Sequence, residues 1–207
     1  MEEKILILDF GSQYTQLIAR RVRELNIYCE IFPYNKAPKN IENFKGLILS
    51  GSPFSVHDVE APSVNLEEFK NIPILGICYG AQMVAKISGC NVLNSEIREY
   101  GRAKLNYINN SSLILDGVKS NSDVWMSHGD TITNNKDVLE VIASTDDVKV
   151  ASYYIKKLNF YGLQFHPEVT HSAEGKKILE NFTVKICGCN KKWTPDKFVE
   201  QTVRELK

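Results

Sequence analysis

The first half of the chain alternates between continuous apolar runs and stretches in which apolar residues recur at helical spacing. Continuous runs are typical of strands covered on both faces, and a repeat of about three to four residues is typical of a helix with one buried side. We expect strands at 4–10, 27–32, 46–50 and 72–77, and helices at 14–25 and 81–88. This alternation predicts an α/β fold: a doubly wound, mainly parallel sheet with helices on both faces.

From about residue 92 the pattern changes to strands with alternating polar and apolar positions, joined by turns rich in Asn, Asp and Gly. We expect these strands to be antiparallel and to extend the same sheet. They are predicted at 102–108, 122–126, 138–144, 148–155 and 160–165. An amphipathic helix over 173–187 then closes the domain, with apolar positions at Ile178, Leu179, Phe182 and Ile186.

The length of 207 residues fits one domain with a short appendage, because a domain takes roughly 150 residues. We place the domain at 1–189. We interpret 190–207 as a linker that leads into a further domain, with a short helix at 196–206.

Charge and composition narrow the classes of partner. With 25 basic and 25 acidic residues the net charge is zero, so no global field would hold nucleic acid or an anionic membrane. No apolar run approaches the roughly 18 residues of a membrane span, and the start MEEKILIL lacks the features of a signal peptide. Five cysteines, an odd number, indicate a reducing cytoplasm. We expect no metal at Cys187-Gly-Cys189, whose spacing does not suit zinc.

Cys78 is the first candidate for chemistry. It lies between the expected strand at 72–77 and the helix at 81–88, flanked by Gly76 and Gly80. Such a turn is tight, so a side chain two residues before or after the nucleophile would collide with neighbouring backbone. A helix N-terminus also favours ionisation of a thiol. The alternative is a small buried core cysteine, so a base is needed to decide.

His166-Pro167-Glu168 supplies a candidate base at the end of the strand 160–165. Two residues apart in an extended segment, His166 and Glu168 point to the same side. The carboxylate can then accept from one ring nitrogen while the other faces a thiol, which is the logic of Cys-His-acid triads. Taken alone, His166 fits an ordinary histidine in a surface turn better than a catalytic base.

Together these motifs resemble the class I, triad-type glutamine amidotransferases. The matching residues are Gly76-Ile-Cys78-Tyr-Gly80-Ala-Gln82 and His166-Pro-Glu168. Within that family the chain is most similar to the glutaminase domains of glutamine-hydrolysing GMP synthetases. This narrower resemblance rests on four further blocks: 7–24, Arg98-Glu-Tyr-Gly101, Met126-Ser-His128-Gly-Asp130 and Trp193-Thr-Pro-Asp-Lys-Phe198.

The resemblance implies hydrolysis of L-glutamine to glutamate and ammonia through a cysteinyl thioester, with Cys78, His166 and Glu168 as catalytic residues. It implies that the backbone N–H groups of Tyr79 and Ser52 form the oxyanion hole. The family has glycine where this chain has Ser52, which would be strained if the turn needed a positive φ. By the same resemblance, five residues bind glutamine: Gly51, Gln82, Ser127, His128 and Gly129.

The resemblance also implies a partner. The ammonia would pass to an ATP-pyrophosphatase domain that converts XMP to GMP, and no glycine-rich phosphate loop for ATP occurs in this sequence. We therefore expect no cofactor on this chain, with ATP and magnesium on the synthetase domain. Asp130 and 98–101 are interpreted as facing that domain. The alternatives are the glutaminase subunit of another amidotransferase, a cysteine peptidase-like hydrolase and a catalytically silent interaction module.

Overall fold

The computed structural model describes residues 3–133, 135–196 and 203, with the backbone alone for 95–99. The α-helices are α1 Thr15–Arg23, α2 Tyr79–Ile87 and α3 Gly175–Glu180, and α3 continues as a π-helix over Asn181–Ile186. The strands are β1 Lys4–Asp9, β2 Tyr28–Pro33, β3 Phe44–Leu49, β4 Ile74–Ile77, β5 Val92–Lys104, β6 Tyr107–Ile108, β7 Asp123–Ile132, β8 Glu140–Ser144, β9 Ser152–Ile155 and β10 Phe160–Leu163. Short 3-10 helices occupy Tyr34–Lys36, Leu66–Phe69, Leu113–Leu115 and Lys156–Leu158.

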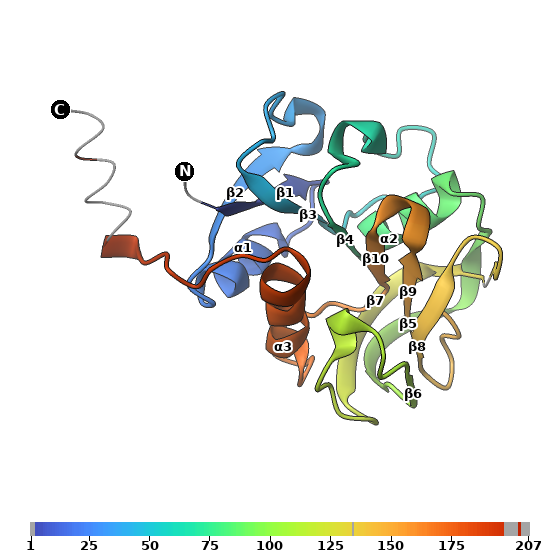
Figure 1. Cartoon of the computed structure of the whole chain (residues 1–207). Coiled ribbons are helices and arrows are strands. Elements are labelled where there is room, and N and C mark those ends of the chain that lie inside the picture. The colour runs from blue at the N-terminus through green and yellow to red at the C-terminus, as the bar shows by residue number, and fades with distance from the viewer. Residues whose placement is uncertain (1–2, 134, 197–202, 204–207) are drawn as a thin grey trace.

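Among the described residues, an eight-stranded sheet has the order β2-β1-β3-β4-β10-β9-β8-β6. The first five of these strands are parallel, and β9, β8 and β6 are antiparallel to their neighbours. The predicted α/β fold, with its parallel sheet and antiparallel extension, is confirmed. Figure 1 shows how the sheet runs through the molecule.

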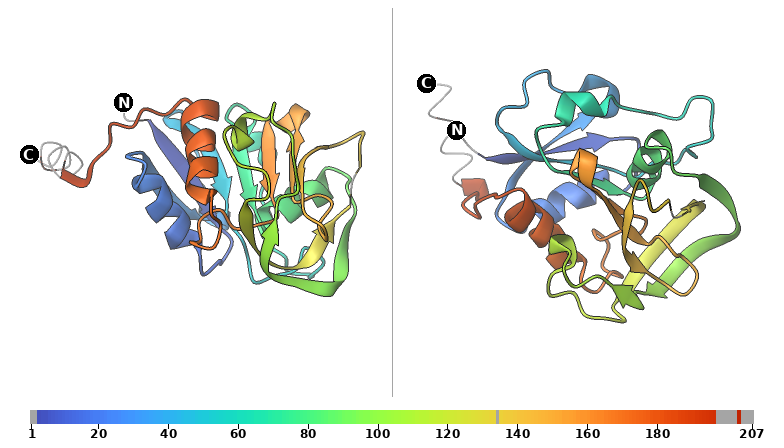
Figure 2. Two further views of the ribbon diagram at one scale, coloured as in Figure 1. Left: turned by 90° about the horizontal axis from the view of Figure 1, so that it is seen from below. Right: turned by 45° about the vertical axis from the view of Figure 1, so that its right-hand side comes forward.

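Apolar side chains on the two faces of the sheet belong to two separate cores. On β1, Ile5 and Ile7 pack with α1 and α3, whereas Leu6 and Leu8 pack with α2. This division follows from strand geometry, since successive side chains point to opposite faces. Helices α1 and α3 therefore cover one face side by side and α2 covers the other (Figures 1 and 2).

Two details of the second half differ from our expectation. Strand β10 was expected to extend the antiparallel part, but it pairs in parallel with β4. Strands β5 and β7 do not join the main sheet; they form a two-stranded antiparallel sheet of their own. A single bridge between Met126 and Phe165 connects β7 to the end of β10. This small sheet lies at the carboxyl ends of the parallel strands, where residues of β5 and β7 form one wall of a pocket.

The predicted boundaries of the domain stay a prediction. After the π-helix, Trp193 packs its ring on Tyr28 of the edge strand β2, and its backbone N–H donates to the Asn26 carbonyl over 3.0 Å. The helix predicted for 196–206 lies almost wholly outside the described residues. Within the part of the chain that the structure describes, no helix is long and apolar enough to cross a membrane.

Candidate active site

Four loops meet at the carboxyl ends of adjacent parallel strands. They follow β1, β3, β4 and β10, which are neighbours in the sheet. With the wall formed by β5 and β7 they enclose a cavity of about 770 Å³. The cavity is lined by Gly11, Ser12, Gln13, Tyr14, Gly51, Ser52, Pro53, Phe54, Ser55, Cys78, Tyr79, Gln82, Asn94, Tyr100, Ser127, His128, Gly129, Asp130 and His166. Carboxyl ends of parallel strands are the usual place for ligands in such sheets.

Cys78 occupies the turn between β4 and α2 in a strained conformation. Its φ is 51° and its ψ is −108°. Residues other than glycine rarely adopt this backbone conformation, because it costs them roughly 1–3 kcal/mol. The turn is held by its neighbours, since the Cys78 N–H donates to the Leu163 carbonyl over 2.8 Å and the Cys78 carbonyl accepts from Gln82 N–H over 3.0 Å. The thiol is thereby pushed out of the strand and towards the cavity.

The two glycines flanking the turn are required by close backbone contacts. A Cβ on Gly76 would lie 2.7 Å from the Ala81 nitrogen and 2.5 Å from the Phe160 ring. A Cβ on Gly80 would lie 2.7 Å from the Leu49 carbonyl oxygen. The collision expected from the sequence is therefore present on both sides of Cys78.

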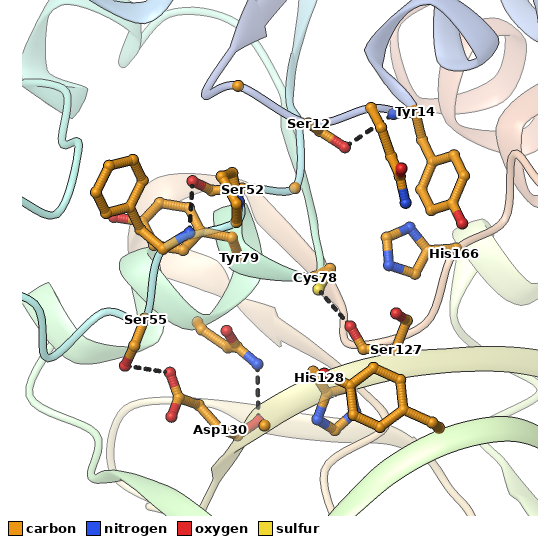
Figure 3. A pocket seen from close by; sticks show the side chains of 18 of the residues that line it. Ser12, Tyr14, Ser52, Ser55, Cys78, Tyr79, Ser127, His128, Asp130 and His166 are labelled. Atoms are coloured by element: carbon orange, nitrogen blue, oxygen red, sulfur yellow. Dashed lines mark hydrogen bonds between the residues drawn. The ribbon is translucent and has the colours of Figure 1, made fainter.

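His166 lies beside the thiol because β10 pairs with β4 (Figure 3). His166 Nδ1 is 2.7 Å from Glu168 Oε1, and the Cys78 thiol donates to the Ser127 carbonyl over 3.7 Å. All three side chains are buried, with Cys78 6% and His166 3% exposed. The Tyr14 ring meets the His166 ring edge-on at 5.3 Å between centroids. The predicted triad residues are thus assembled in one place.

The surroundings of His166 favour its imidazolium form. Burial alone would lower the pKa of the ring, but hydrogen bonds to the Cys78 side chain and to the Glu168 carboxylate outweigh burial and hold the pKa well above its ordinary value. His128 behaves in the opposite way, because burial lowers its pKa to about 4. Of the two histidines in the cavity, His166 is therefore suited to hold and transfer a proton, while His128 stays neutral.

Both predicted oxyanion donors lie at the cavity. The N–H of Tyr79 is the first of α2, so no carbonyl earlier in the helix can accept from it. Ser52 follows β3, and its hydroxyl accepts from the Phe54 N–H over 3.2 Å. Among the described non-glycine residues, positive φ occurs at Asn26, Cys78, Asn121 and Asn159. Ser52 is absent from this set, so the turn does not need the glycine that the family pattern has there.

All five predicted glutamine-binding residues line the cavity: Gly51, Gln82, Ser127, His128 and Gly129. Gln82 also ties α2 to β7, because its amide nitrogen donates to the Asp130 carbonyl over 2.7 Å. This bond holds the wall formed by 127–130 against the helix that begins at the thiol. The binding roles of the five residues stay predictions.

Sequence reasoning misplaced one charged residue. Asp130, expected to face a partner domain, is buried at 7% exposure and lines the cavity. Its carboxylate Oδ2 accepts from the Ser55 hydroxyl over 2.7 Å. Tyr14 and Ser55 were not predicted as site residues. Of the segment 98–101, the side chains of 98 and 99 lie outside the described residues, and Tyr100 lines the cavity with its side chain largely exposed.

The remaining cysteines are structural. Cys29, Cys90, Cys187 and Cys189 are buried, and burial raises the pKa of each thiol, to about 11 for Cys29 and about 12 for Cys189. Within the described residues, no group of three or more His, Cys, Asp or Glu side chains is arranged to hold a metal ion.

Fold and site agree with the comparisons with known proteins. The family model for class I glutamine amidotransferases matches residues 6–186. In addition, a candidate GMP synthase subunit from Thermoplasma acidophilum is 32% identical, with a TM-score of 0.80 over 91% of this chain and 95% of that one. The chain therefore belongs to the class I glutamine amidotransferases, which confirms the resemblance seen in its motifs.

The curated relatives point to one branch of this family. A glutamine-hydrolysing GMP synthase from Cytophaga hutchinsonii is 58% identical over all of this chain, and one from Bacteroides thetaiotaomicron is 55% identical. The chain spans 41% of the length of each of these two relatives. A glutamine amidotransferase from Thermotoga maritima, 19% identical, shares the fold with a TM-score of 0.75 over 90% of this chain and 99% of that one.

Proposed function

We propose that this chain hydrolyses L-glutamine to glutamate and ammonia through a thioester on Cys78. The observation that supports this most directly is the strained Cys78 at the start of α2, facing a buried His166 whose Nδ1 is 2.7 Å from Glu168. Membership of the class I glutamine amidotransferases supplies the substrate. The triad-like arrangement supplies the reaction type, acyl transfer by a nucleophilic thiolate.

The first step is attack of the Cys78 thiolate on the side-chain amide carbon of glutamine. The carbonyl oxygen gains negative charge and needs donors that are already in place. The N–H groups of Tyr79 and Ser52 serve this purpose. One such donor is worth roughly 3–4 kcal/mol, or about 10²–10³ in rate.

His166 manages the proton in both halves of the reaction. As imidazolium it gives its proton to the amide nitrogen, the carbon–nitrogen bond breaks, and ammonia leaves with Cys78 acylated. The neutral ring then takes a proton from water, the hydroxide adds to the thioester, and the carbon–sulfur bond breaks to release glutamate and regenerate the thiolate. Glu168 fixes the ring through Nδ1 and stabilises the imidazolium.

Asp130 gives the cavity a way to recognise an amino acid. It is the one carboxylate among the described residues that line the cavity, and glutamine carries an α-ammonium group. Among the described residues, the donor to this buried carboxylate is a neutral hydroxyl, that of Ser55, so the group retains capacity for a cation. We therefore assign the α-ammonium to Asp130 and the amide end of glutamine to Cys78.

The ammonia would go to an ATP-pyrophosphatase domain that converts XMP to GMP. The relatives called GMP synthase extend well beyond the length of this chain. This supports a synthetase partner, in the same polypeptide or on a separate one. ATP and magnesium would bind on that partner, and the cytoplasm would be the place of the reaction.

The test is release of ammonia and glutamate from glutamine by the purified chain. It is run with and without the remaining part of the Cytophaga hutchinsonii relative, XMP and ATP. Cys78→Ala should abolish release, whereas Cys90→Ala, at a buried cysteine away from the cavity, should keep it. A rise with the partner supports the whole proposal.

Two other outcomes would correct it. Release that needs Cys78 but ignores this partner would overturn the assignment to GMP synthesis and leave a glutaminase for another amidotransferase. No release under any condition would overturn the enzymatic proposal and leave a silent interaction module.

A further inference from the structure

The three carbonyl groups of the turn 166–168 are each contacted by a different part of the chain. The His166 carbonyl accepts from the Ser172 hydroxyl over 2.5 Å. The Pro167 carbonyl lies directly against Gly175, at the start of α3, where any Cβ would overlap its oxygen. The Glu168 carbonyl accepts from Arg21 Nε of α1 over 2.9 Å. The backbone of this turn is therefore fixed residue by residue.

Fixing the backbone matters because the Glu168 side chain is poorly held. The residue is fully buried, and its Oε1 meets His166 Nδ1. The second oxygen, Oε2, has no hydrogen-bond donor among the described residues. With a single partner, the carboxylate takes its orientation from the backbone beneath it. A shift of this backbone would lengthen the bond to His166 and release the ring.

Arg21 is itself held in position for this contact. Its Nη1 donates to Glu24 Oε2 over 2.8 Å, one helical turn further along, and the other oxygen of Glu24 accepts from Arg20 Nε over 3.0 Å. Glu24 thus sets the guanidinium of Arg21 so that Nε points at the Glu168 carbonyl. Arg20 shares the same carboxylate but extends into solvent, since its side chain is 73% exposed against 23% for Arg21.

Ser172 has the corresponding place at the other end of the turn. While its hydroxyl donates to the His166 carbonyl, its oxygen accepts from the Trp125 N–H over 3.0 Å. The His166 N–H in turn donates to the Trp125 carbonyl over 3.0 Å. Ser172 therefore closes a small ring of hydrogen bonds that joins His166 to strand β7, the same strand that forms the wall of the cavity.

We propose that Arg21 and Ser172 are positioning residues of the active site, which act through the backbone of the turn 166–168 to hold Glu168 and His166 against Cys78. The inference rests on the proposed glutamine hydrolysis for its kinetic readout. It extends that proposal to residues outside the cavity, on α1 and on the segment before α3. Neither Arg21 nor Ser172 is among the residues that line the cavity.

The first measurement is kinetic. Arg21→Met should lower kcat for glutamine by roughly tenfold to a hundredfold, as a small displacement of a catalytic group does, and should leave KM within about twofold because the cavity wall is unchanged. Arg21→Lys keeps a cationic donor and should recover part of the loss. Arg20→Met is the matched control, since it removes an equivalent ion pair to Glu24, and its kcat should equal that of the unmodified chain.

A double-mutant cycle separates positioning from general stability. If Arg21 acts through Glu168, then adding Arg21→Met to Glu168→Gln should lower kcat by less than about twofold more. A merely structural role would lower kcat by the same factor in both backgrounds. Ser172→Ala gives an independent reading at the other end of the turn, and thermal unfolding of each variant reports its folding.

A second measurement does not depend on glutamine hydrolysis. Alkylation of Cys78 by iodoacetamide, followed against pH by mass spectrometry, reports the thiolate that is paired with imidazolium. The groups facing His166 are Cys78, Glu168 of its own turn, Tyr14 after β1 and His128 of β7. Among these, Glu168 is the one that Arg21 controls. Arg21→Met should therefore move the onset of alkylation to higher pH.

The alkylation profile keeps the two proposals apart. If the unmodified chain released no ammonia, the proposed function would fail while the profile still tested the positioning residues. If folded Arg21→Met and Ser172→Ala both gave the profile of Arg20→Met, the positioning proposal would be overturned. Should Arg21→Met not fold, Arg21→Lys and Ser172→Ala decide the matter by the same comparison.

Discussion

Adding one methyl group at Gly80 tests whether the packing of α2 on β3 sets the position of the nucleophile. The new Cβ would lie 2.7 Å from the Leu49 carbonyl oxygen and 3.0 Å from that of Ser50. Both are backbone atoms of a buried segment, so the helix must move. Overpacking of this kind costs about 1–3 kcal/mol, and alanine regains about 1 kcal/mol over glycine within a helix. Gly80→Ala should therefore lose up to about 2 kcal/mol.

Two assays test this expected loss of stability. A loss of up to about 2 kcal/mol corresponds to a fall in unfolding temperature of up to about 8 °C for a chain of this size. The fold survives, but the displaced helix carries the Tyr79 N–H away from the oxyanion, so kcat for glutamine should fall by at least about tenfold. Gly129→Ala is the control for stability alone, because its Cβ meets no atom within 4 Å. A Gly80→Ala protein with an unchanged unfolding temperature and full activity would refute the reasoning.

Three further predictions concern charge. Asp130→Asn should raise KM for glutamine by about tenfold with a smaller change in kcat, and Ser55→Ala should raise it less; initial rates measure both. Because hydrogen bonds to Cys78 and to Glu168 raise the pKa of His166, the protonated ring stabilises the fold fully below about pH 6.5, and this contribution is lost as pH rises through the folded pKa. Urea unfolding against pH should show this loss, and Glu168→Gln should reduce it. At pH 7 iodoacetamide should modify Cys78 first, by peptide mass spectrometry, ahead of the thiols whose pKa burial raises: Cys29, Cys90, Cys187 and Cys189.

The parts of the fold that the sequence predicts well are those set by local patterns. Strands β1 to β4 and helix α1 lie within a few residues of their predicted bounds, because continuous apolar runs and helical spacing are local signals. The turn at Cys78 is also local. Glycine two residues to either side is the mark of a strand-to-helix turn that leaves no room for a Cβ, and the contacts of Gly76 and Gly80 show this.

Pairing between distant strands could not be predicted in the same way. An apolar run such as Phe160–Leu163 reads alike whether its neighbour is parallel or antiparallel. In the fold it lies between β4 and β9, parallel to the first and antiparallel to the second. This choice brings His166 to Cys78, although each motif alone had an ordinary structural interpretation. The family motif linked His166 to Cys78. The pattern of polar and apolar positions around the two residues did not.

The position of Asp130 shows a second limit of prediction from the sequence. In the sequence it is a charged residue that follows the strand expected at 122–126, for which a solvated or partner-facing position is the ordinary expectation. Strands β5 and β7 leave the main sheet, and Asp130 then turns into the cavity against Ser55. A buried carboxylate at a cavity is a candidate functional feature. Its burial depends on the separation of β5 and β7 from the main sheet, which no local sequence pattern predicts.

Under the proposed mechanism, Ser52 keeps a backbone N–H donor although its side chain departs from the family pattern. The oxyanion requires an N–H group, which every residue but proline has, so glycine is needed only if the turn demands positive φ. Ser52 does not adopt such a conformation, and its hydroxyl bonds to the Phe54 N–H and thereby steadies the turn. The strain of this active site is concentrated instead at Cys78, where φ is 51°. Cys78, the proposed nucleophile, is therefore the residue that the fold must hold in place, rather than Ser52. This explains why close contacts converge on the turn at Cys78 and on the turn 166–168.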